Sequence, residues 1–167
     1  MNMISTLTRL DTMLAEIRIA ARSPLPERDG AVAAAIGPHL ADPELLDGKE
    51  CPCNPDRYVR HLLGEGDGYA VVALVWRPGQ MSPVHSHHTW CALGVHRGML
   101  TEHFFAAGAP PKPTAAVLRG QGDLSHGPAG PEVIHRIANC SAEIAVSIHV
   151  YGVPFANFGD GVNLVLA

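Results

Sequence analysis

The sequence lacks a basic excess, a long apolar run and a large set of cysteines, and each absence excludes a class of protein. Its 167 residues include 16 acidic and 12 basic side chains, for a formal net charge of −4, whereas a nucleic-acid-binding domain normally presents a basic face. No apolar stretch approaches the roughly 20 residues that a membrane-spanning helix needs, and residues 1–21 lack the unbroken apolar core of a secretory signal. Four scattered cysteines are too few for a disulfide framework. We therefore expect a reduced, cytoplasmic protein that binds neither nucleic acid nor membrane.

The remaining composition fits one compact domain with many turns. Hydrophobic residues make up 47% of the chain and charged residues 17%, which argues against disorder and against a coiled coil. The length suits a single domain, for which roughly 100–200 residues are usual. Ten histidines against three tyrosines are the unusual feature, and they give the first indication of a metal site.

The apolar pattern divides the chain into a helical N-terminal part and a β-rich body. Apolar residues at three- and four-residue steps predict an amphipathic helix over residues 1–20. A second helix is predicted over residues 31–36, and a short third one from Asp42 to Gly48, because Asp caps free amides and Gly ends a helix. From Arg57 onward, short strands separated by turns are typical of a sandwich or barrel. These strands are predicted at 69–76, 85–95, 100–105, 115–118, 133–138 and 144–151.

Three histidines in the β-rich body form a candidate metal site. His85 and His87 lie two apart on a predicted strand, so both side chains point to one face and can share an ion. A bare H-x-H is a weak motif, but a strand that ends in Pro-Gly precedes it. His135 lies in a later predicted strand, and His126, in a loop rich in glycine and proline, is its nearby competitor.

At these residues the sequence resembles the cupin superfamily, whose first motif is a glycine, five residues, H-x-H, three or four residues, a glutamate, six residues and a glycine. Cys91 stands where the glutamate is expected, and the second motif places a further histidine at His135. The resemblance implies a mainly β cupin fold (a double-stranded β-helix or jelly-roll barrel) in one domain, 1–167, with 1–50 as a helical N-terminal cap and 57–167 as the barrel. The positions that match the first motif are Gly79, His85, His87 and Gly98.

The missing glutamate has a chemical consequence. Three neutral imidazoles leave a divalent ion with its full charge and with open positions. Such a site should attract an anionic, electron-rich ligand such as a thiolate, which also suits the mixed ligand preference of iron.

Two further motifs narrow the resemblance to the cysteine dioxygenase-like thiol dioxygenases, over about residues 57–155. Tyr58-Val-Arg60 is similar to that family's Y-x-R, whose arginine holds the substrate carboxylate, and an always charged, forked guanidinium suits this role. Ser147-Ile-His149-Val-Tyr151 is similar to its S-x-H-x-Y relay, in which Ser147 orients His149 and His149 holds Tyr151 over the metal. His149 is otherwise an alternative third ligand.

In animal members of this family, a cysteine at the old glutamate position is thioether-linked to the relay tyrosine. The resemblance makes Cys91 and Tyr151 the candidates for such a crosslink here. The alternative is that Cys91 is a small buried residue without a crosslink.

The resemblance implies an Fe(II)-dependent dioxygenase that converts a small thiol carboxylate to its sulfinic acid with O₂, without an organic cofactor. Relatives that prefer 3-mercaptopropionate typically carry glutamine at the position of Arg60 and use an arginine nearer the C-terminus. This chain has no arginine after Arg136, which favours cysteine; 3-mercaptopropionate or another mercapto acid is the alternative.

Two other classes stay open: a three-histidine nickel, copper or manganese enzyme acting on a non-thiol, and a non-catalytic small-ligand binding module. The implied site comprises His85, His87 and His135 on the metal, Arg60 and Tyr58 on the substrate, and Tyr151, His149, Ser147 and Cys91 in catalysis.

Overall fold

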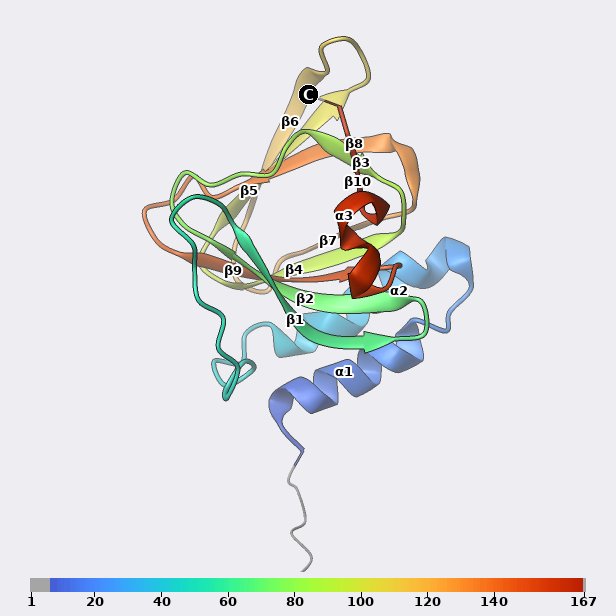
Figure 1. Cartoon of the computed structure of the whole chain (residues 1–167), viewed down its shortest axis with the longest axis vertical. Helices are drawn as coiled ribbons and strands as arrows, with labels where there is room; N and C mark the ends of the chain where they lie inside the picture. The colour runs from blue at the N-terminus through green and yellow to red at the C-terminus, as the bar shows by residue number, and fades with distance from the viewer. Residues whose placement is uncertain (1–6, 167) are drawn as a thin grey trace, which may run out of the picture.

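The computed structural model describes residues 7–166 and contains two antiparallel, five-stranded sheets that face each other (Figure 1). The predicted mainly β fold is therefore confirmed, and helices lie in its N-terminal part as expected. Sheet A contains, in spatial order, β1 (Val59–Gly66), β2 (Tyr69–Trp76), β9 (Ala145–Tyr151), β4 (Cys91–Arg97) and β7 (Leu124–Gly127). Sheet B contains β10 (Asn163–Val165), β3 (His85–His87), β8 (Gly130–Ala138), β5 (Leu100–Ala106) and β6 (Lys112–Arg119).

Two helices cover the outer face of sheet A (Figure 1). Helix α1 (Arg9–Ala20) begins after Thr8, whose Oγ accepts a hydrogen bond from the Asp11 N–H at 3.0 Å. The Asp11 carboxylate accepts one in return from the Thr8 N–H at 2.9 Å, and this reciprocal cap satisfies amides that the helix leaves free. Helix α2 (Leu25–Ile36) packs over β4 and β7, and the 3₁₀ turn η1 (Gly37–His39) follows it.

The helices differ from the predicted ones mainly at their ends. The described part of the first helix begins only at Arg9, and residues 1–6 of the predicted helix lie outside the described residues. The second helix starts at Leu25 rather than at residue 31, because proline in its first turn costs no hydrogen bond. The predicted third helix is wrong. Residues 43–48 form consecutive turns, because so short a segment closes three-residue turns without completing an α-helical nucleus.

The central strands of sheet A, β2, β9 and β4, are buried on both faces, so their residues alternate between two cores. Every residue of β2 is buried, since the helices cover one face and the barrel interior lies on the other. Strand β9 divides in the same way. Its residues that face the helices are Val146, Ile148 and Val150, and those that face the barrel interior are Ser147, His149 and Tyr151.

The predicted strand 85–95 is two strands in different sheets. The chain leaves β3 in sheet B, crosses at residues 88–90 and enters β4 in sheet A. Strand β3 lies between β8 and the C-terminal β10, which the chain reaches through η2 (Phe155–Asn157) and α3 (Phe158–Gly161). The sequence pattern also missed β1, β7 and β10, because short or bulged strands lack a clear two-residue period.

The helices of the described chain are short. None of them is both long enough and apolar enough to cross a membrane.

Candidate metal centre

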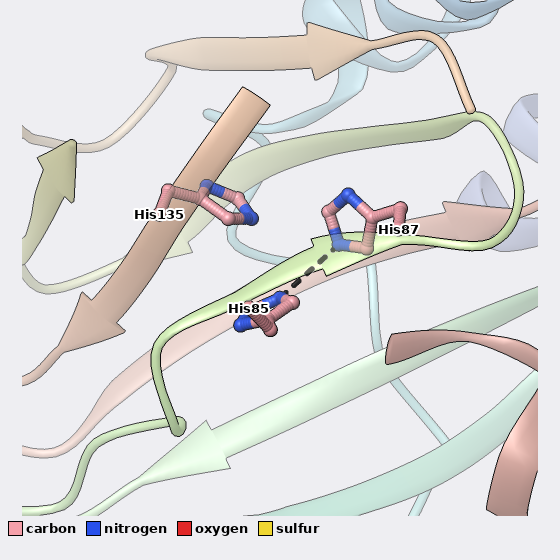
Figure 2. A group of neighbouring side chains, drawn as sticks. All are labelled: His85, His87 and His135. Atoms are coloured by element: carbon pink, nitrogen blue, oxygen red, sulfur yellow. Dashed lines mark hydrogen bonds between the residues drawn. The ribbon is translucent and has the colours of Figure 1, made fainter. Parts of the chain in front are cut away.

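Three histidines from two neighbouring strands of sheet B point toward one another inside the barrel (Figure 2). Strand alternation puts His85 and His87 on the same face of β3, and His135 lies directly opposite His85 on β8. Their ring centroids are 4.7–5.0 Å apart. One nitrogen from each ring lies within 4.8 Å of the other two, so the structure brings together the three predicted ligands.

The surroundings of His85 and His135 leave a ring nitrogen of each directed at the centre of the cluster. A backbone carbonyl can only accept, so the His85 Nδ1–H donates to the Pro83 oxygen at 2.9 Å and Nε2 carries the lone pair. His85 Nε2 lies 3.2 Å from His87 Nε2. The His135 Nε2 is buried and has no hydrogen-bond partner among the described residues. Buried nitrogens left in this way fit a metal ion that accepts their lone pairs.

The rings are also held in the form that binds metal. Burial, helped by the charge of His135, lowers the pKa of His85 to about 4. The same two causes, with a contribution from His85, lower the pKa of His87 to about 2. Both imidazoles are therefore neutral at pH 7, as a metal ligand must be.

A second constellation crosses the pocket from sheet A. Trp76 Nε1–H donates to Ser147 Oγ at 2.9 Å, Ser147 Oγ lies 2.9 Å from His149 Nε2, and His149 Nδ1 lies 2.9 Å from Tyr151 Oη. Burial keeps the pKa of His149 well below its usual value, so the ring is neutral and carries one N–H. If that N–H were on Nε2, the Ser147 hydroxyl hydrogen would have no acceptor among the described residues. We therefore assign the order Trp76 to Ser147 to His149 to Tyr151, which leaves the Tyr151 O–H free to donate into the pocket.

Cys91 and Tyr151 are direct neighbours across the β4–β9 pairing. Opposite residues of an antiparallel pair have Cβ atoms roughly 4.5–5.5 Å apart. Both side chains are buried and line the pocket that contains the three histidines. Burial, with smaller contributions from Glu102 and Asp29, raises the pKa of the Cys91 thiol far above its usual value, so the residue is a neutral thiol.

Arg60 supplies the positive charge of this pocket. It lies on β1, at the edge of sheet A, and its Nη2 donates to Tyr58 Oη at 3.4 Å. Tyr58 stacks on Trp76 with ring centroids 4.3 Å apart. The Arg60 Nε is buried without a partner, and no Asp or Glu is among the described residues that line the pocket. An unneutralised guanidinium is suited to a carboxylate ligand.

The pocket is tightly filled by its own side chains. The free space in it is about 10 Å³, which is the room of a single water molecule. A ligand of several atoms must therefore displace a side chain.

Comparison with known proteins agrees with this arrangement. The family model described as cysteine dioxygenase type I matches residues 51–159. The chain belongs to the cysteine dioxygenase type I family. With the three-histidine cluster, family membership marks it as a metal-dependent thiol dioxygenase in the general sense.

Solved structures with a similar fold are only distantly related in sequence. A conserved protein with a double-stranded β-helix domain from Klebsiella pneumoniae is 18% identical, with a TM-score of 0.55 over 73% of this chain and 94% of that one. A protein from Thermus thermophilus is also 18% identical, with a TM-score of 0.51 over 62% of this chain and 91% of that one. These likenesses support a double-stranded β-helix fold and nothing finer.

The other histidines do not join the cluster of this cysteine dioxygenase family member. His126 lies on β7 rather than in a loop, and its Nδ1 lies 2.9 Å from the Asp29 carboxylate. His149 has both ring nitrogens in hydrogen bonds to the relay. His149 therefore has no free ring nitrogen, and His126 is not among the residues whose ligand atoms gather at the cluster.

Glu102, a residue of β5 that contacts the cluster, was not predicted from the sequence. Its side chain is 1% exposed, and its Oε1 lies 2.8 Å from His135 Nδ1. Burial is the strongest influence on the pKa of Glu102 and raises it, but His135 and Arg119 together outweigh burial and lower it overall. The available signal was an acid at an inward-facing position of an alternating strand, between Leu100 and Phe104.

Proposed function

We propose that this protein is an iron(II)-dependent dioxygenase that oxidises cysteine to its sulfinic acid, with both oxygen atoms of O₂ transferred to sulfur. The observation that carries the proposal is a cluster of three imidazoles, without a carboxylate, in one pocket with an unneutralised arginine. His85, His87 and His135 would hold the iron. Bound iron would supply the redox chemistry that allows O₂ to react with a thiol, and no organic cofactor is needed.

Arg60 anchors the substrate in this proposal. Its guanidinium binds the carboxylate in a charge-assisted pair, with Tyr58 beside it, and this contact fixes the direction in which the sulfur points. Holding the reacting atom in place removes much of the entropic barrier of the reaction. Because the pocket contains no second cation among its described lining residues, the substrate's single carboxylate has one place to bind.

Tyr151 is the hydrogen-bond donor of the reaction. The relay directs its O–H into the pocket, toward the place where the thiol and O₂ meet. His149 and Ser147 set that direction, and Trp76 fixes the order of donors behind them.

We also propose the thioether crosslink between Cys91 and Tyr151. Their direct opposition on β4 and β9 supports it. Forming the bond removes two hydrogens, with O₂ as the oxidant, so the intact mass after turnover should fall by two hydrogens. Cys91→Ser should abolish this mass shift, and an unchanged wild-type mass after turnover would argue for an uncrosslinked buried cysteine.

Cysteine is favoured over 3-mercaptopropionate because Arg60 is the arginine that the pocket contains. The decisive experiment loads the metal-free protein anaerobically with Fe(II), adds cysteine or 3-mercaptopropionate, and then admits air. Loss of O₂ and formation of sulfinate with cysteine support the proposal, and faster turnover of 3-mercaptopropionate would reassign the substrate. No turnover with either thiol at full iron occupancy would defeat the proposal in favour of a non-thiol enzyme or a binding module.

The setting of the protein is part of the same proposal. We propose one cytoplasmic domain, 1–167, with residues 1–50 as the helical cap. All four cysteines are free in the structure, which suits a reducing compartment.

A further inference from the structure

Glu102 is a buried acid that the proposed reaction does not use. Its carboxylate is the centre of four contacts. Oε1 lies 2.8 Å from His135 Nδ1 and accepts from Ser125 Oγ at 3.0 Å, while Oε2 accepts from Arg119 Nε at 2.9 Å and from Arg119 Nη2 at 2.7 Å. We propose that Glu102 is a positioning residue of the metal centre, which holds His135 as a ligand and is itself held by Arg119.

The contact between Glu102 and His135 fixes which nitrogen faces the cluster. An ionised carboxylate can only accept a hydrogen bond, so His135 carries its proton on Nδ1. Its Nε2 then presents a lone pair, and this is the nitrogen that the structure leaves buried and without a partner. A carboxylate behind a ligating imidazole also strengthens the nitrogen as a donor.

Arg119 keeps the carboxylate out of the metal's coordination sphere. Two guanidinium nitrogens bind Oε2, and the imidazole with Ser125 occupies Oε1, so neither oxygen is free to turn toward the ion. The negative charge that the general cupin motif would place at Cys91 is thus present one layer farther out, behind His135. The cluster remains a set of three nitrogens, and Arg119 neutralises the carboxylate that lies behind it.

This inference rests on the proposed function only for the assignment of a metal to the three histidines. Its test therefore measures metal affinity of the apo-protein and no thiol oxidation. Titrating Co(II) anaerobically into Glu102→Ala should show affinity lowered roughly 10- to 100-fold, the usual cost of removing such a partner. Glu132→Gln is the matched control, because it removes an exposed acid from the strand of His135.

A small carboxylate should restore the lost contact. Glu102 and Arg119 line a cavity of about 340 Å³ that also reaches His87 and His135, and formate is small enough to enter it. Formate added to Glu102→Ala should bind against Arg119 and raise the affinity for Co(II) severalfold. In the wild-type protein, where Glu102 occupies this place, formate should have no such effect.

A second variant distinguishes a role of Glu102 in positioning the metal ligand from a role in stability alone. Glu102→Leu/Arg119→Leu removes both charges together with the acceptor of the His135 Nδ1–H, and it avoids an unpaired guanidinium, so it serves also if Glu102→Ala does not fold. It should keep a wild-type melting temperature within a few degrees but bind Co(II) about tenfold more weakly. Wild-type affinity in a folded Glu102 variant would overturn the proposal. A loss of affinity without any thiol oxidation in the wild type would leave it standing and remove only the proposed function.

Discussion

Strands β8 and β9 each carry one histidine into the pocket, and the hydrogen-bond partners of the two rings distinguish a metal ligand from a relay residue. On β9, His149 has a hydroxyl at each ring nitrogen, Ser147 on one side and Tyr151 on the other. On β8, His135 has a partner only at Nδ1, and its Nε2 is left buried and unpaired. Both residues are buried histidines inside strands. The supply of hydrogen-bond partners decides which ring holds the metal.

Removing one ring from each strand should have the largest effect and tests the difference between His135 and His149 directly. His135→Ala should lower metal affinity more than about 100-fold, because a direct ligand contributes more than the partner behind it. His149→Ala should leave metal affinity nearly unchanged while it lowers turnover. Titration of metal into both apo-proteins checks this, with His88→Ala, at an exposed neighbour of the cluster, as the control. Equal losses in the two variants would place His149 on the metal.

The next effect concerns Arg60 on the relay side. Arg60→Ala should weaken binding of a thiol carboxylate by about 2 kcal/mol, or roughly 30-fold, because it removes a charge-assisted pair. Binding of 2-aminoethanethiol, which has no carboxylate, should hardly change. Arg57→Ala removes an exposed arginine from the same segment and serves as the control. Unchanged affinity for the acid would show that the carboxylate binds elsewhere.

A smaller effect follows from the order of donors in the relay. Trp76→Phe keeps a ring to stack on Tyr58 but removes the N–H that fixes the Ser147 hydroxyl. Turnover should fall roughly tenfold, less than the loss expected when Tyr151→Phe removes the donor itself. Metal affinity should stay constant in both. Trp90→Phe, in the core under the helices, is the matched control, and equal rates in Trp76→Phe and wild type would reject the assigned order.

The smallest effect is on the stability of the apo-protein in acid. Burial lowers the pKa of His85 from 6.5 to about 4, so the unfolded chain takes up this proton at a higher pH than the folded one. Between these values the unfolded state binds more protons, and the free energy of unfolding must fall as the pH falls. Thermal melting of the apo-protein from pH 7 to 4 should show this decline, and His85→Asn should make it shallower, because the lowered pKa values of His87 and His149 still contribute. His88→Asn, which changes an exposed histidine, should leave the slope as it is.

The sequence predicted those features that depend only on neighbouring residues along the chain. The run of β2 is apolar on both faces and was predicted to its ends, and the H-x-H spacing placed two rings on one strand face because side chains alternate. Glu102 could not be predicted to contact His135, because the two residues are brought together only by the pairing of β5 with β8. For the same reason the crossing between β3 and β4, which moves the chain from one sheet to the other, is invisible in the apolar pattern.

The two-faced burial of β9 ties catalytic competence to correct folding. If this strand were paired one residue out of register, Ile148 and Val150 would enter the pocket and the imidazole and phenol would be pressed against the helices. A misregistered sheet would thus lose both its apolar contact with the helices and the hydrogen-bond donors of the pocket. A partly folded form of this chain should therefore be inactive. Recovery of activity on refolding should coincide with correct pairing of both sheets.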